Sequence, residues 1–121
     1  MTTGEGAGHV IQAVTYTGCS PARLYGAVVR AVGEIGFAIT SRDDATMVIG
    51  FRPATPTGSW PYEHMTAAVS ADGDGARIVL GGAPVGGAWL QMSGWREGHQ
   101  IAMMVLDRLK TVLPQVPEPT P

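Results

Sequence analysis

The chain has 121 residues, of which 45% are hydrophobic and 15% are charged, and its formal net charge is −2. This length fits one domain with a core of its own, and the low charged fraction excludes global disorder. Acidic and basic residues are mixed along the chain without a basic stripe, so we expect no nucleic-acid partner.

The sequence also indicates a cellular setting. Cys19 is the single cysteine, so no disulfide can form within the chain. The first ten residues lack the basic and apolar regions of a secretory leader, and no apolar run approaches the roughly 20 residues that span a bilayer. Lys110 is the only lysine and asparagine is absent, a usage typical of GC-rich bacterial genomes. We therefore expect a cytoplasmic bacterial protein without membrane insertion.

The first half of the chain predicts a strand followed by a helix. The run from His9 to Thr17 alternates along its length and is rich in β-branched residues, which indicates a strand. Ser20 is typical of an N-cap, Pro21 of a first helical position and Gly36 of a helix stop. These residues bound the most clearly marked helix in the sequence.

Two hairpins follow the first helix. Phe37–Arg42 and Met47–Pro53 are joined by an acidic turn and predict the first hairpin. Ala54–Pro61 is rich in proline and predicts a loop. Tyr62–Ser70 and the run after the ADGDG turn, Ala76–Gly82, predict the second hairpin.

A second helix is predicted near the end of the chain. Apolar residues recur at helical spacing between His99 and Leu113, with Ser93 as the expected N-cap and Pro114 as the stop. The last eight residues contain four prolines and predict an extended, mobile tail.

The order β-α-β-β-β-β-α predicts an α+β domain with an antiparallel sheet of about five strands and both helices on one face. Such an arrangement is helix-grip-like. We expect this single domain over residues 9–113, between a flexible leader, residues 1–8, and a Pro-rich flexible tail, residues 114–121.

One stretch resembles a bacterial family. Leu24 to Phe51 reads LYGAVVRAVGEIGFAITSRDDATMVIGF, a helix ending in Gly-Phe, a strand, an acidic pair and a strand reading Ile-Gly-Phe. It resembles the repeated domains of the outer-membrane assembly lipoprotein BamC and small uncharacterised bacterial lipoproteins. The resemblance implies a compact helix-grip-type domain used for interaction rather than catalysis. It carries over no catalytic residue and, without a lipidated leader cysteine, no membrane tether.

No complete catalytic, metal or cofactor motif is present. His9, His64 and His99 are far apart in sequence and none has a ligand partner at a repeating spacing, so we expect no metal site. The glycine-rich stretch from Gly81 to His99 matches neither a P-loop nor a dinucleotide fingerprint, so we expect no cofactor. Cys19 precedes a helix N-terminus, where a thiol can be activated, but a small buried apolar side chain is the preferred interpretation.

The tryptophans and methionines near the last helix remain open to two interpretations, core packing or a binding surface. The predicted ligand- or partner-binding residues are Trp60, Tyr62, His64, Trp89, Met92, Trp95, Arg96, His99 and Met103.

Three functions are predicted in order of preference. The first is a non-enzymatic binding or scaffolding domain that contacts a second copy of itself, as a homo-oligomer, or another protein. The alternative is a helix-grip domain for a small apolar ligand, whose pocket between the sheet and the last helix is lined by Tyr62, His64, Trp89 and Met103. The third is a small enzyme that uses His64 and His99, with Glu63, Arg96 or Cys19, in acid–base or nucleophilic roles.

Overall fold

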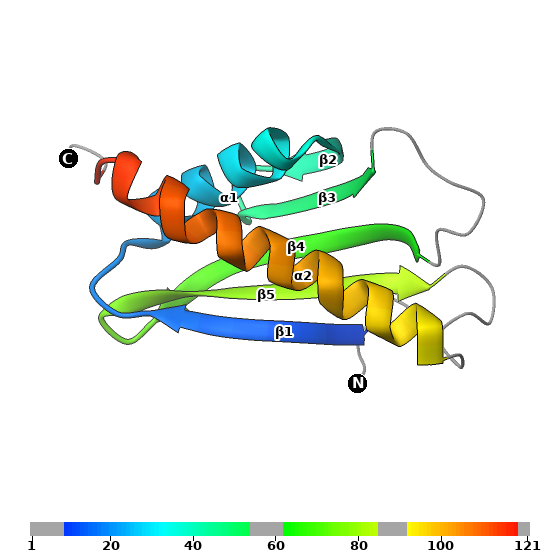
Figure 1. Ribbon diagram of the computed structural model, residues 1–121. Coiled ribbons are helices and arrows are strands. Elements are labelled where there is room, and N and C mark those ends of the chain that lie inside the picture. Colours follow the sequence, from blue (N-terminus) through cyan, green and yellow to red (C-terminus); the bar gives the residue numbers. More distant parts are fainter. Residues whose placement is uncertain (1–8, 54–61, 85–91, 119–121) are drawn as a thin grey trace.

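A computed structural model describes residues 9–53, 62–84 and 92–118. Within them the chain forms one strand, a helix, four further strands and a second long helix (Figure 1). This order confirms the predicted α+β class. The elements are β1 (His9–Tyr16), α1 (Pro21–Ile35), β2 (Phe37–Asp43), β3 (Val48–Pro53), β4 (Tyr62–Asp72), β5 (Gly75–Pro84), α2 (Met92–Val112) and a short 3-10 turn, η2 (Leu113–Gln115).

Helix α1 begins and ends where the sequence predicts. The Ser20 hydroxyl accepts a hydrogen bond from the backbone N–H of Arg23 at 3.1 Å, and Pro21 takes the first helical position. Gly36 adopts the left-handed conformation with φ of 103°, and its N–H bonds back to the last turn. A side chain is disfavoured at that φ, so the glycine fixes the point at which the helix stops.

The five strands form one antiparallel sheet in the order β1-β5-β4-β3-β2. Strands β2 to β5 follow one another as a meander, and β1 is added on the far side of β5. Opposite residues share a face in such a sheet, and the register places Ala67 of β4 between Ile49 of β3 and Leu80 of β5. All three are buried, so this face is the inner one.

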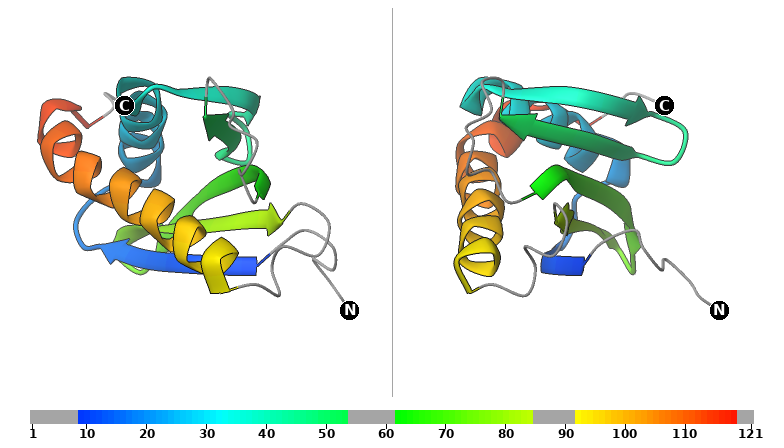
Figure 2. Two further views of the ribbon diagram at one scale, coloured as in Figure 1. Left: turned by 45° about the vertical axis from the view of Figure 1, so that its right-hand side comes forward. Right: turned by 90° about the vertical axis from the view of Figure 1, so that its right-hand side faces the viewer.

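Both helices cover the inner face, as predicted (Figure 2). Helix α1 contacts β2, β4 and β5, while α2 contacts β1 and β5, and the two helices also contact each other. The core between the layers is apolar, and no polar or charged side chain is buried among the residues that the structure describes. The largest fully buried side chains are Phe51, Leu24, Ile49, Met65, Ile78, Leu80, Leu109, Val28, Val32, Val105 and Val112.

The second hairpin is tighter than the ADGDG pattern predicts. Strand β4 runs to Asp72 and β5 begins at Gly75, so the turn itself is only Gly73 and Asp74. Gly73 adopts a positive φ of 60°, which its lack of a side chain permits. Gly75 is needed for a different reason, because a Cβ at this position would lie 2.9 Å from the Cα of Thr17 at the end of β1.

Helix α2 is longer than its hydrophobic period predicts. It begins at Met92, so Ser93 lies in the first turn rather than at the N-cap. The glycines at 94 and 98 lower helical propensity, so the sequence does not predict a helix over this part of the chain. Gly98 is buried, which indicates that packing supports the helix where propensity does not. Gly81 and Gly82, interpreted as a joint, are instead buried within β5.

Candidate functional site

The sheet opens at one end. Strands β3 and β4 pair only over Val48–Phe51 and Met65–Ala68, whereas β4 stays paired with β5 as far as Tyr62 and Pro84. The last residues of β3 and the first residues of β4 therefore extend beyond their mutual pairing. The start of β1 and the start of α2 lie at this same end (Figure 1). We call this region the open end of the sheet.

The inner face next to the open end is apolar. Phe51 and Met65 are opposite each other in the register and both are fully buried. The ring of Phe51 stacks on that of Phe37, with centroids 5.6 Å apart. Gly82, opposite Met65 on β5, adds no side chain to this floor. These side chains already make their dispersion contacts within the protein, and none of them is an acid, base or nucleophile.

The two helices are joined at the opposite end of α2. Arg108 of α2 donates to Glu34 of α1 at 3.2 Å, and Arg23 of α1 donates to the carbonyl of Leu113 at 3.0 Å. From this junction α2 leads away from α1 toward its own N-terminus at the open end (Figures 1 and 2). Helix α2 is thus tied to α1 near its C-terminal end, and its strand contacts are with β1 and β5.

The predicted binding residues divide into three groups. Trp60 and Trp89 lie outside the described residues. The backbone of Tyr62 and His64 forms the start of β4, and that of Met92, Trp95 and Arg96 forms the first turns of α2, so both stretches are at the open end. Their role in binding remains a prediction.

His99 and Met103 form the third group, on the outer side of α2. The buried positions of this helix include Ala102, Val105 and Leu109, which face the sheet and α1. Met103, one residue on from Ala102, is therefore rotated away and is 45% exposed. The helical period therefore turns Met103 away from the layer between sheet and helix, and its role in binding remains a prediction.

A shallow depression lies on this outer side of α2. It is lined by His99, Gln100, Met103, Met104 and Asp107, and its surface is mostly apolar. Met104, like Met103, is 45% exposed. Two adjacent exposed methionines on one helix are a candidate contact surface.

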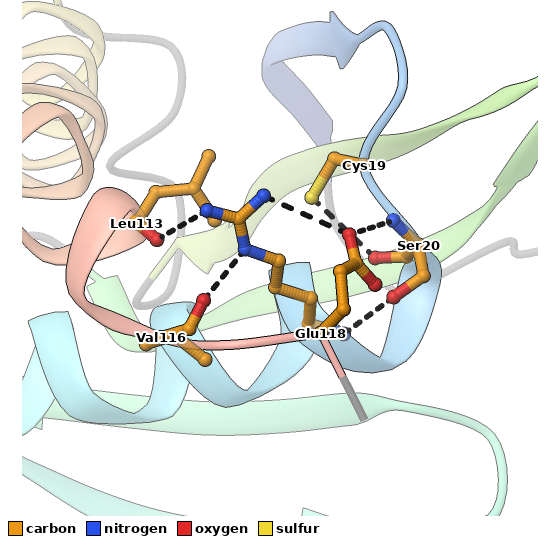
Figure 3. Close-up of polar contacts among 6 residues, drawn as sticks. Cys19, Ser20, Leu113, Val116 and Glu118 are labelled. Atoms are coloured by element: carbon orange, nitrogen blue, oxygen red, sulfur yellow. Dashed lines mark hydrogen bonds and ion pairs between the residues drawn. The ribbon is translucent and has the colours of Figure 1, made fainter. Parts of the chain in front are cut away.

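The segment after α2 is held against α1 rather than extended from Pro114 onward. The Arg23 guanidinium donates to the carbonyls of Leu113 at 3.0 Å and Val116 at 2.6 Å. The backbone N–H of Ser20 donates to Glu118 at 3.3 Å, and Figure 3 shows Glu118 beside Ser20 and Cys19. Sequence reasoning missed these contacts because they join residues 90 or more positions apart.

Cys19 is the buried apolar side chain that the sequence favours. It is 4% exposed, and burial raises the pKa of its thiol, with Glu118 adding to the rise while Arg23 opposes it. A raised pKa is the opposite of what an activated nucleophile needs. Cys19 belongs to the connection between β1 and α1, and this connection lies at the end of the sheet away from the starts of β4 and α2 (Figure 1).

A second polar cluster fixes the first hairpin to α1. The Tyr25 hydroxyl and the Arg42 guanidinium both donate to Asp44 Oδ1 at 2.6 Å. Burial and this hydrogen bond raise the pKa of Tyr25, while Arg42 and Tyr25 lower the pKa of Asp44. All three groups are used in mutual contacts, so the cluster is structural.

The described residues hold no group of three histidine, cysteine or acidic side chains that could bind a metal ion. In the same part of the chain, no helix is both long and apolar enough to cross a membrane.

The five-stranded antiparallel sheet with α2 packed across it is a helix-grip-like fold. A comparison with solved structures finds 16 similar chains. One of them, described as the crystal structure of Ara h 8.0201, superposes with a TM-score of 0.59 at 14% identity over 86% of this chain and 95% of the other. This likeness confirms the predicted helix-grip-like fold. No family model matches the sequence, and no curated protein matches it either. The resemblance to BamC repeats is therefore unsupported by the comparisons.

Proposed function

We propose that this protein is a non-enzymatic binding domain for a small apolar ligand, held at the open end of the sheet beside the N-terminal half of α2. The observation that carries the proposal is the separation of β3 from β4 beyond Phe51 and Met65 on an apolar inner face. The helix-grip fold supports it, because ligands commonly bind between the layers of such concave folds.

Two further features support a binding role over a catalytic one. The described inner-face residues beside the open end, Phe51, Met65 and Gly82, are apolar and supply no group for proton transfer. The thiol of Cys19, one of the proposed nucleophiles, is buried with a raised pKa. A scaffolding role, the first of the predicted functions, receives no support from the comparisons. The cytoplasmic location, the bacterial origin and the boundaries of the domain remain predictions.

The proposal is tested with an apolar fluorescent probe and two matched truncations on β4. Met65 and Val69 both lie on the inner face, but Met65 is at the open end and Val69 is four residues further into the paired sheet. We expect probe fluorescence to saturate with the native protein. Met65→Ala should change the probe affinity several-fold, whereas Val69→Ala should lower stability and leave that affinity unchanged.

Thermal unfolding of each variant gives the control for folding, because both truncations create a core cavity. Met65→Ala should cost about 2 to 5 kcal/mol, and Val69→Ala, which removes fewer atoms, should cost less. Native mass spectrometry of protein purified from its expression host would detect any co-purified lipid as extra mass on the protein. Equal effects of the two variants on probe affinity, or no saturable probe binding by the native protein, would reject the proposed site.

A further inference from the structure

We infer that the outer side of α2 is a self-association surface, on which a second copy of this chain docks its own α2 in antiparallel orientation. The surface consists of His99, Gln100, Met103, Met104 and Asp107, which line the depression described above. It is separate from the open end of the sheet and does not depend on the proposed ligand.

The apolar centre of the surface is the methionine pair. Met103 and Met104 are each 45% exposed, while the neighbouring positions Ala102 and Val105 are fully buried. Methionine is enriched in protein interfaces because its flexible thioether adapts to the opposing surface. A second methionine pair is therefore a chemically suitable partner for the first.

The polar residues of the surface identify the partner as a second copy. His99 and Asp107 are both exposed, and each lies four residues from Met103, one before it and one after it. Residues four apart lie on the same side of a helix. When two copies of α2 pack antiparallel with their Met103 side chains near the two-fold axis, His99 of each copy faces Asp107 of the other.

This arrangement has the reciprocity that a two-fold dimer requires, because each surface contacts an identical one. An imidazole N–H can donate to a carboxylate in both symmetry-related pairs. A contact limited to one side of one helix is smaller than a standard interface of about 800 Å² per partner, so the dimer is weak and concentration-dependent.

The test is sedimentation velocity of the full chain between about 10 μM and 1 mM, the range in which small interfaces associate. We expect the native protein to form dimers in this range and Met103→Glu to remain monomeric. His99→Glu places two carboxylates together and Asp107→Lys removes the acceptor, so each should weaken association roughly fivefold to tenfold.

The double variant His99→Glu/Asp107→Lys keeps an opposite-charge pair across the two-fold and should restore association toward the native level. Asp74→Lys makes the same charge reversal in the exposed turn between β4 and β5 and should leave association unchanged. A native protein that stays monomeric at 1 mM would overturn the inference, as would a double variant that associates no better than either single variant.

Discussion

Gly75 provides a sharp test of how the second hairpin packs against the end of β1. The backbone of Gly75 has no positive φ, so the conformation itself would accept alanine. The obstacle is space, since an added Cβ would lie 2.9 Å from Thr17 Cα and closer still to the carbonyl oxygen of Tyr16. Both atoms belong to the backbone of β1 and its following turn, so no side chain can rotate to make room.

Gly75→Ala must therefore displace β1, whose Tyr16 pairs with Ala76. Overpacking of this kind costs about 2 to 3 kcal/mol. For a domain of this size each kcal/mol lowers the melting temperature by roughly 3 to 5 °C, which gives a decrease of about 6 to 15 °C. Calorimetry, with urea unfolding as the independent measure of free energy, checks this value.

Gly33→Ala is the matched control, because it makes the same chemical change in α1, where an added Cβ meets no atom within 4 Å. Alanine should stabilise the helix by about 0.5 to 1 kcal/mol through its higher propensity. The two substitutions are thus expected to act in opposite directions. If Gly75→Ala proved as stable as the native protein, the close approach of β5 to β1 would be refuted.

Three further outcomes follow from the contacts around α1 and α2. Arg23→Ala removes the hydrogen bonds to the segment after α2, so alkylation of Cys19 in the folded protein should become several-fold faster; an unchanged rate would show that these contacts do not shield the thiol. Two carboxyl groups have pKa values below their ordinary 4.5 in the folded protein: Glu34 through its hydrogen bonds to arginines, chiefly Arg30, and Glu118 through Ser20 first. Their ionised forms therefore stabilise the fold above about pH 4.5, and this contribution is lost as the pH falls through the lower folded values. The urea midpoint should decrease below pH 4.5, and less steeply in Glu34→Gln, whereas identical pH profiles would contradict the assignment. Leu109→Ala, at a fully buried position of α2, should cost about 2 to 5 kcal/mol in urea unfolding, and a loss below 1 kcal/mol would mean that α2 is not packed as described.

The caps and turns were readable from the sequence because their causes are local. Ser20, Pro21 and Gly36 each act within one turn of helix, and the structure confirms the helix that they bound. The alternating apolar residues of β4 and β5 are likewise the ones buried on the inner face. They are Met65, Ala67 and Val69 of β4 and Ala76, Ile78 and Leu80 of β5.

The candidate site was less readable because its geometry depends on pairing at a distance. The list of aromatic and methionine residues did not include Phe51 or Met65, since each is an ordinary strand residue until the register places them opposite each other at the last β3–β4 pair. Composition does not specify how α2 is rotated against the sheet. The buried positions Ala102, Val105 and Leu109 fix that rotation, which leaves Met103 45% exposed.

By itself the sequence determined the element order, the α+β class, the ends of α1 and the placement of Cys19 in the core. Hydrophobic period, caps and turn residues act over a few positions, so they can be interpreted without the rest of the chain. Only the tertiary structure decided that β1 lies beside β5, that α2 extends back to Met92, and that Arg23 binds the segment near the C-terminus. Each of these depends on residues far apart in sequence, whose contacts form only when the sheet and both helices are assembled around one core.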